Sequence, residues 1–369
     1  MVIKLNDYDK SILDSYFQQK NNNVLCSEIQ NDFLGEAYDC IHKEDIDTCK
    51  KDGHDEKESM KFLFYSEAEI DEEEPLIQEL EQKNGFGNFN LLCSKKYTEN
   101  PYYATIKSQH IKDKNYILDV NRFEPYECFT YNDTLSNSNN GYAEITPIGY
   151  FNESVPYLYL SKNDVIWMSI TPHEINTMEK AIEKAHGKVI TFGLGLGYYA
   201  FMTSIKEEVD SVTIVENDQS IISLFEKNLL PSFPKKEKIK IVKADAFHYM
   251  EKAKDFDTLF IDIYHTPEDA LPLYLKFKRL EKQMKFPYKI DYWIEDSILC
   301  LLRRYVLTLL EEYYQGLSEQ DYLNDCDIES KILKALYFAL KNFHFSSIKE
   351  IDDILSDKGL IELAKNTKI

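Results

Sequence analysis

The stretch that decides the fold is residues 189–200, VITFGLGLGYYA. A mostly apolar run, residues 189–192, stops at glycines 193, 195 and 197. A helical pattern follows at once, with Tyr198, Met202, Ile205 and Val209 on one face. Glycines suit a sharp backbone turn that a ligand approaches closely, because they carry no Cβ. The stretch therefore predicts a β-strand, a glycine turn and an α-helix.

The next predicted strand, residues 211–215, ends in Glu216, nineteen residues after Gly197. A carboxylate at this point can accept hydrogen bonds from both ribose hydroxyls of a nucleoside cofactor. An acid at a helix N-terminus, stabilised by the helix dipole, is the other interpretation of Glu216, and Asp218 could fill that role instead.

The spacing of the glycines indicates which cofactor to expect. Dinucleotide folds usually have a glycine at the sixth position of GxGxxG, where this chain has Tyr198. After the glycine turn no Lys or Arg occurs until Lys206, so little is arranged to bind a pyrophosphate. A GxGxG turn followed by an acidic strand end resembles the class I S-adenosylmethionine-dependent methyltransferases. The resemblance covers roughly residues 171–300. It implies a Rossmann-like fold and S-adenosylmethionine as the cofactor.

The resemblance also implies a set of cofactor-binding residues at the ends of the first three strands. Asp245 corresponds to the position that reads the adenine edge, although it could also cap the helix that starts near Phe247. Phe247 fits an adenine contact or the core equally well. The expected cofactor-binding residues are Gly193, Gly195, Gly197, Glu216, Asn217, Asp245 and Ala246.

The end of the fourth strand normally faces the transferred methyl group in this family. Asp262, Tyr264 and His265 lie there, and we expect them to orient the acceptor or to accept its proton. His265 could instead be an exposed loop histidine. Enzymes that methylate the amino groups of DNA bases carry two prolines in this motif. This chain lacks them, so methylation of DNA bases is not expected. Tyr264 occupies the position of the second acid of metal-dependent relatives, so no metal is expected.

Composition narrows the functional class. The chain has 369 residues, 43% of them hydrophobic, and a net charge of −21. Broad nucleic-acid binding needs clustered Lys and Arg, so we expect no nucleic-acid partner. A small-molecule or peptide acceptor, including a cationic one, is compatible with the charge. No apolar run approaches the ~20 residues of a membrane span, the N-terminus lacks a signal-peptide pattern, and cytoplasmic localisation is expected.

The pattern along the chain suggests three regions. Residues 1–170 are expected to be helical and then β-rich, with a polar loop at residues 132–140, and to cover the active site. Thr171 and Glu174 fit a capping box that starts the cofactor domain, residues 171–315. Strands and helices then alternate, which predicts a doubly wound, mainly parallel α/β sheet. Residues 316–369 are expected to form a helical extension that replaces the family's terminal β-hairpin or mediates homodimerisation.

Two alternatives remain open. The first is a spermidine-synthase-like aminopropyltransferase, which has a similar layout. However, that family's glycine turn holds an acid where this chain has Leu196, and its strand-four loop has a second acid where this chain has His265. The second is a non-enzymatic interaction protein that retains the fold. The intact glycines, Glu216 and Asp245 argue against it.

Overall fold

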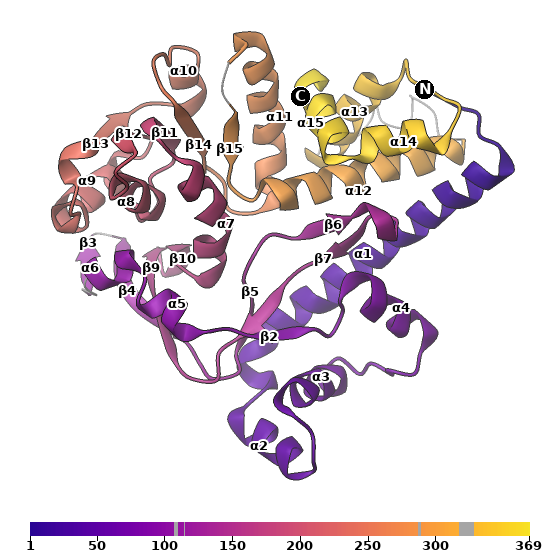
Figure 1. Cartoon of the computed structure of the whole chain (residues 1–369), viewed down its shortest axis with the longest axis horizontal. Helices are drawn as coiled ribbons and strands as arrows, with labels where there is room; N and C mark the ends of the chain where they lie inside the picture. The colour runs from indigo at the N-terminus through magenta and orange to yellow at the C-terminus, as the bar shows by residue number, and fades with distance from the viewer. Residues whose placement is uncertain (107–109, 114, 287–288, 317–327) are drawn as a thin grey trace.

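The computed structural model describes residues 1–106, 110–113, 115–286, 289–316 and 328–369, with residues 36–40 described by their backbone alone (Figure 1). A five-stranded parallel sheet in the order β13-β12-β11-β14-β15 forms the centre of the predicted cofactor domain. Its strands are β11 (Gly187–Phe192), β12 (Val209–Glu216), β13 (Ile239–Lys243), β14 (Thr258–Ile261) and β15 (Ile290–Tyr292). The predicted doubly wound α/β fold is confirmed.

Pairing within this sheet aligns the carboxyl ends of its central strands. Phe192 of β11 pairs with Val215 of β12 on one side and with Ile261 of β14 on the other. The residues that follow these three, Gly193, Glu216 and Asp262, therefore leave the sheet at the same level. Ligands of open α/β sheets bind at this edge.

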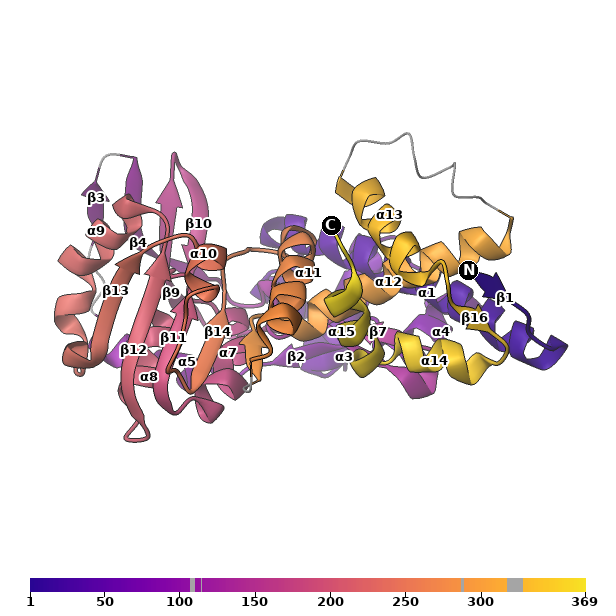
Figure 2. The same ribbon diagram turned by 90° about the horizontal axis from the view of Figure 1, so that it is seen from above.

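Helices flank the sheet on both faces (Figure 2). They are α7 (Pro172–Lys184), α8 (Tyr198–Ser204), α9 (Gln219–Asn228), α10 (Ala246–Met250) and α11 (Pro267–Met284). The next helix, α12 (Glu295–Tyr314), leads away from the sheet and packs against α1 and the C-terminal helices. The helix after the glycine turn is shorter than predicted. It ends at Ser204, and Val209, expected on its apolar face, pairs with Gly187 as the first residue of β12.

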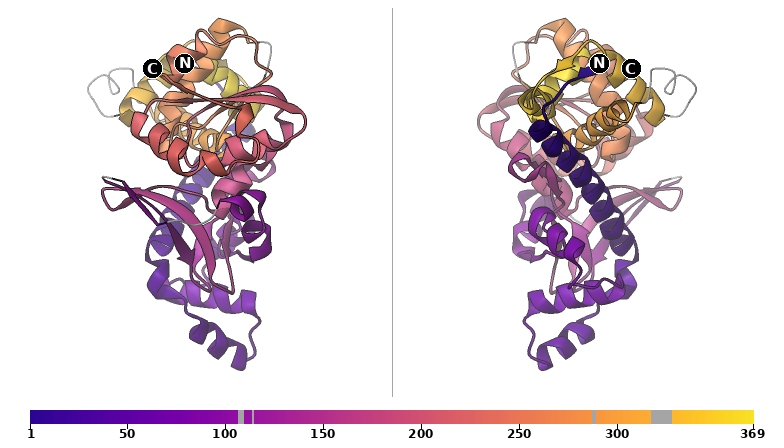
Figure 3. Two further views of the ribbon diagram at one scale, coloured as in Figure 1. Left: turned by 90° about the vertical axis from the view of Figure 1, so that its left-hand side faces the viewer. Right: turned by 90° about the vertical axis from the view of Figure 1, so that its right-hand side faces the viewer.

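A four-stranded antiparallel sheet, in the order β10-β9-β4-β3, lies below the parallel sheet (Figure 3). Its strands are β3 (Ile111–Asp113), β4 (Tyr116–Phe123), β9 (Val155–Lys162) and β10 (Val165–Ser169). Strands β9 and β10 form a hairpin that turns at Asn163 and Asp164, which have φ angles of +53° and +64°.

Shorter strands connect this sheet to the rest of the N-terminal region. They are β2 (Phe89–Leu91), β5 (Cys128–Thr130), β6 (Leu135–Asn137), β7 (Ala143–Ile145) and β8 (Ile148–Tyr150). The predicted polar loop at residues 132–140 is in part wrong, because β6 pairs antiparallel with β7. Asp133, in the same segment, is held against α12, because its carboxylate accepts a hydrogen bond from the Ser297 hydroxyl at 2.6 Å.

The N-terminal helices surround a second apolar core that contains Phe33, Phe64 and Phe89. These helices are α1 (Asp7–Cys40), α2 (Lys43–Lys51), α3 (Glu56–Glu67) and α4 (Pro75–Asn84). Two shorter helices, α5 (Ser94–Thr98) and α6 (Pro101–Thr105), instead contribute Tyr97 and Tyr102 to the larger core. Helix α1 is 34 residues long and runs beside both the C-terminal helices and the N-terminal strands (Figure 3). No helix among the described residues is both long and apolar enough to cross a membrane.

The part of the C-terminal region that the structure describes, residues 328–369, is helical apart from one short strand. Its elements are α13 (Ile328–Leu340), β16 (His344–Phe345), α14 (Ile348–Leu355) and α15 (Asp357–Asn366). Strand β16 pairs in parallel with β1 (Val2–Ile3), so the start of the chain lies beside the C-terminal region.

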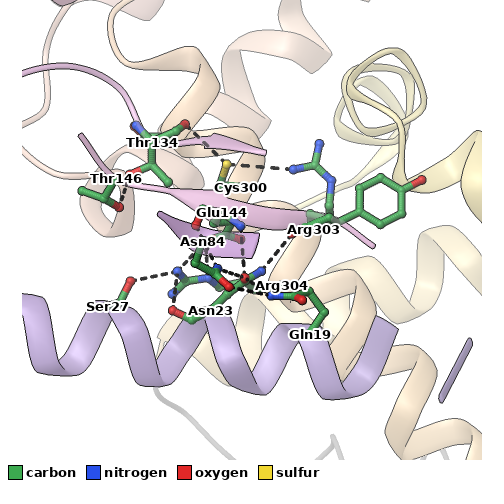
Figure 4. Close-up of polar contacts among 12 residues, drawn as sticks. Gln19, Asn23, Ser27, Asn84, Thr134, Glu144, Thr146, Cys300, Arg303 and Arg304 are labelled. Atoms are coloured by element: carbon green, nitrogen blue, oxygen red, sulfur yellow. Dashed lines mark hydrogen bonds and ion pairs between the residues drawn. The ribbon is translucent and has the colours of Figure 1, made fainter. Parts of the chain in front are cut away.

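A buried polar network joins the N-terminal region to α12 (Figure 4). Arg304 of α12 forms an ion pair with Glu144 of β7, which is 5% exposed, and donates to the Ser27 hydroxyl of α1 at 2.9 Å. Asn84 of α4 donates to the Asn23 side chain at 2.8 Å and to the Glu144 carbonyl at 2.9 Å. Four elements that are distant in sequence are thus held by one set of satisfied polar groups.

Candidate functional site

A cavity of about 560 Å³ lies at the carboxyl edge of the parallel sheet. This volume falls within the range of roughly 300–1,000 Å³ that is typical of small-molecule sites. Nine of the ten predicted site residues line it, and Gly197 does not. The residues that matter most for its chemistry are Trp167, Glu174, Gly193, Gly195, Glu216, Asn217, Asp245, Ala246, Asp262, Tyr264, His265 and Trp293.

The three glycines of the turn have positive φ angles, and each has a different surrounding. A Cβ on Gly193 would lie 1.7 Å from the Asp262 carbonyl oxygen, and one on Gly197 would lie 2.4 Å from the Phe225 ring. A Cβ on Gly195 would meet nothing within 4 Å. Packing therefore requires glycine at the outer two positions, whereas Gly195 leaves open space at a residue that lines the cavity.

The Glu216 carboxylate stabilises the loops around it. One oxygen accepts from the Leu194 N–H at 3.1 Å, and the other accepts from the N–H groups of Asn217 and Asp218 at 2.7 Å each. A carboxylate has about four acceptor positions, so about one remains for a ligand. For Glu216 to accept both ribose hydroxyls, as predicted, one of these backbone bonds must be exchanged.

Asp245 both lines the cavity and caps α10, because its carboxylate accepts from the His248 N–H at 2.9 Å. The capping interpretation is therefore correct, and an adenine contact stays a prediction. Phe247 stacks on Phe277 at a centroid distance of 4.0 Å and does not line the cavity. Of its two interpretations, the structure supports the one in which it belongs to the core.

Two carboxyl groups face the cavity without partners. Neither Asp262 nor Glu174 forms a side-chain hydrogen bond or ion pair with any described residue. Burial, with a smaller contribution from the Glu216 charge, raises the pKa of Asp262 to about 7. Burial, and then the Asp262 charge, raises the pKa of Glu174 well above its usual value. Since no Lys or Arg of the described chain lines this cavity, it lacks a counter-ion for these groups.

The predicted capping box at the start of α7 is wrong. Thr171 is the N-cap residue, but its side chain makes no capping hydrogen bond, and Glu174 lines the cavity instead. Glu174 is thus a site residue that sequence reasoning missed. The first turn of a helix favours an acid whether or not a ligand lies nearby, so the local sequence carries no signal that separates the two roles.

The structure does not support the catalytic roles predicted for Tyr264 and His265. The Tyr264 hydroxyl donates to the Trp293 carbonyl at 2.7 Å, and burial raises its pKa, so it forms part of the cavity wall and is no free base. His265 is exposed, and its Nδ1 lies 3.4 Å from an Asp269 oxygen. This is the loop-histidine interpretation, at the rim of the cavity. The structure therefore favours Asp262 among the three candidates.

The hairpin of β9 and β10 contributes an aromatic residue to the rim. The Trp167 ring lies 4.3 Å from Lys162 Nζ and 6.5 Å from the nearly parallel His265 ring. Lys162 also forms an ion pair at 3.7 Å with Asp218, which lies two residues after Glu216 in the chain. The N-terminal β-rich region therefore contacts the predicted cofactor loop directly.

The acids that follow β15 belong to a different environment. Glu295 is bound by Lys278 at 3.0 Å and by the Tyr274 hydroxyl at 2.9 Å, and it does not line the cavity. Within the described residues, no group of three or more His, Cys, Asp or Glu side chains could hold a metal ion.

No protein-family model matches this chain, and no curated protein matches it. Several solved structures are similar to part of it. Spermidine synthase from Thermotoga maritima is 18% identical over 33% of this chain and 49% of its own, with a TM-score of 0.24. A protein in the NADB-Rossmann superfamily from Streptococcus agalactiae is 13% identical over 51% of this chain and 96% of its own, with a TM-score of 0.27.

MNMC2 from Aquifex aeolicus is 18% identical over 41% of this chain and 60% of its own, with a TM-score of 0.26. This chain spans about half the length of the spermidine synthase that it matches. Similarity at these TM-scores carries no argument about activity, which has to be derived from the cavity itself.

Proposed function

We propose that this chain is an S-adenosylmethionine-dependent methyltransferase that acts on a small-molecule or protein side-chain acceptor. The observation that supports it is the convergence of three features on one cavity: the glycine turn, Glu216 and Asp245. They come from three successive strands, and each leaves the sheet at its carboxyl edge. A cavity with Asp262 on the same wall offers a position for an acceptor beside the cofactor.

The residues present fit such a cofactor. Gly195 leaves space for close approach to the backbone, Glu216 retains an acceptor position for a ribose hydroxyl, and Asp245 with Ala246 lies where an adenine edge would be read. Asn217 completes this side of the cavity. S-adenosylmethionine, when bound, supplies a methyl group on a sulfonium that an acceptor lone pair can displace.

Asp262 is the group in this chain best suited to receive the acceptor's proton. A general base works best when its pKa lies near the working pH, and burial together with the Glu216 charge brings the pKa of Asp262 to about 7. Both carboxyls, Asp262 and Glu174, also favour a cationic acceptor, because a cation supplies the charge that their surroundings lack.

The test is an acceptor screen read by mass spectrometry. Purified protein with S-adenosylmethionine is offered pools of small amines, peptides and RNA, and the gain of one methyl group is measured. We expect methylation in an amine-containing pool and its loss in the Asp262→Asn variant. Methylation of RNA alone, or equal activity of the variant, would contradict the proposal.

Aminopropyl transfer is the second candidate, and one observation favours it. The methionyl part of S-adenosylmethionine carries a carboxylate, but no described Lys or Arg lines the cavity to pair with it. Decarboxylated S-adenosylmethionine lacks this group. If that donor alone supports transfer, with the gain of an aminopropyl group on an amine, the second candidate replaces the first.

A further inference from the structure

The edge of strand β10 forms one wall of the cavity. Five consecutive residues, 166–170, line it. Successive side chains of a β-strand point to opposite faces, so one face alone would contribute every second residue. Consecutive lining residues indicate that the cavity meets the edge of the strand, where backbone N–H and C=O groups point.

This edge has no neighbouring strand in the described residues. In the antiparallel sheet, β10 comes first in the order and pairs with β9 alone. A register shift between Ile166 and Met168 marks a bulge at Trp167. Bulges occur next to active sites, where they redirect a side chain, and Trp167 lines the cavity.

The start of this strand is also apolar and exposed. Val165 is 68% exposed and Ile166 is 48% exposed. Edge strands are usually protected by charges or proline against pairing with another chain, yet the sequence from 165 to 170, VIWMSI, has neither. An open, apolar edge at the entrance of a site fits pairing with an extended peptide.

The charge of the cavity indicates what such a peptide carries. The inner wall has the unpartnered carboxyls of Glu174 and Asp262 and, among the described residues, no lining Lys or Arg. The chain as a whole has a net charge of −21. A lysine side chain would supply the missing cation through a flexible, largely apolar stem.

We propose that the acceptor is a lysine in an extended polypeptide segment, which pairs with the free edge of β10 and places its ammonium group between Glu174 and Asp262. This inference rests on the proposed methyl transfer. The ammonium gives one proton to the Asp262 carboxylate. The freed nitrogen lone pair then forms the N–C bond to the methyl group as the C–S bond breaks. The electron pair of the C–S bond stays on sulfur. The product is a methylated ammonium, a thioether and protonated Asp262.

The test uses peptides of about eight residues, long enough to pair along a strand, each with one central lysine among β-forming residues. Matched peptides carry N-methylated backbone amides on both sides of the lysine, which removes strand pairing and keeps the side chain. We expect methylation of the lysine, with kcat/KM at least tenfold lower for the N-methylated peptides. n-Butylamine tests whether the amine alone suffices.

Variants of the protein give an independent readout. Val165→Lys adds a charge to the proposed docking edge and should raise the peptide KM at least fivefold, without changing binding of S-adenosylhomocysteine. Leu135→Lys, at a residue 51% exposed on β6, is the matched control and should leave the peptide KM unchanged.

If the protein binds S-adenosylhomocysteine, any one of three results would overturn the inference. They are that no lysine peptide is methylated, that n-butylamine reacts as well as the peptides, or that backbone N-methylation does not lower kcat/KM. If intact protein does not bind S-adenosylhomocysteine, the proposed function fails first, and this inference fails with it.

Discussion

Asp262 is the residue whose ionisation the proposed reaction needs. Because it must be deprotonated to accept a proton, and because its pKa is about 7, kcat should rise with pH through the neutral range. We expect Asp262→Asn to lower kcat by about 100-fold or more, within the typical range for a general base, and to abolish this rise. A pH profile of both proteins tests this, and a profile shared by wild type and variant would assign the ionisation to another group.

The same carboxyl should reduce the stability of the folded protein at neutral pH. Its pKa is about 7 in the folded state and about 3.9 in an unfolded chain. Between these values the folded state binds a proton that the unfolded state lacks, so stability falls as pH rises from about 4 to about 7. At pH 8 we expect Asp262→Asn to stabilise the fold by about 1 kcal/mol or more, since one pKa unit corresponds to about 1.4 kcal/mol.

Thermal unfolding at pH 5 and pH 8 measures this effect. The stabilisation by Asp262→Asn should be larger at pH 8 than at pH 5. The control Asp210→Asn, at an exposed residue, should show no such difference. A variant that is less stable than wild type at pH 8 would mean that the Asp262 carboxylate has a stabilising partner in solution.

At the scale of single residues, sequence reasoning found the residues that follow a strand and missed one that lies on a helix. Glu216 and Asp262 could be located because each follows an apolar run by one position. Glu174 was interpreted as a helix cap, because its contribution to the cavity depends on how α7 packs against the sheet. The engagement of the Tyr264 hydroxyl by Trp293 is likewise a tertiary contact, between residues 29 apart in sequence.

The glycine turn is the element on which the proposed cofactor site depends, and two variants separate its roles. Gly195→Ala meets no atom within 4 Å but takes a φ of +52°, which costs roughly 1–2 kcal/mol for an L-residue. The protein should remain folded and lose affinity for S-adenosylhomocysteine. Gly193→Ala would place a Cβ 1.7 Å from the Asp262 carbonyl, so we expect misfolding or a large fall in Tm.

Calorimetry and thermal unfolding of both variants check this prediction. The two glycines would have the same role, contrary to this interpretation, if Gly193→Ala folded normally or if Gly195→Ala bound the ligand with unchanged affinity.

Among the elements, the central strands β11, β12 and β14 of the parallel sheet were predictable because each contains a short apolar run that is followed by a glycine or an acid. The length of α8 was not, because Ile205 and Val209 fit a helical period as well as they fit a turn and the next strand. The pairing of β6 with β7 was hidden in a segment whose asparagines and serines suggested a loop.

At the scale of the whole molecule, the buried pair of Arg304 and Glu144 joins the N-terminal region to α12. Arg304→Met would leave Glu144, which is 5% exposed, without its partner. Removing one partner of a buried ion pair typically costs about 3–5 kcal/mol, so urea unfolding should shift by that amount. Lys349→Met, in an exposed pair with Asp353, is the control and should cost about 0–1 kcal/mol. Equal losses in both variants would contradict a structural role for the buried network.

Contacts between distant parts of the chain were the least predictable from the sequence. Asn23, Asn84, Glu144 and Arg304 form one network, but they are spread over most of the chain and have no common local pattern. The same holds for β1 and β16, two-residue strands whose pairing depends on where the surrounding helices end. The helical character of the C-terminal region was predictable from its periodicity, whereas its docking was not.

We propose that the glycine turn and the acids of neighbouring strands form one adenosyl site. Titration calorimetry with S-adenosylhomocysteine tests it most directly, on wild type and on Glu216→Ala, with thermal unfolding to verify that both are folded. We predict binding to wild type and an affinity lower by about tenfold to 100-fold in the variant, because hydrogen bonds to a charged group contribute about 1.5–3 kcal/mol. Folded wild-type protein that binds no ligand, or a variant that binds equally well, would contradict the claim.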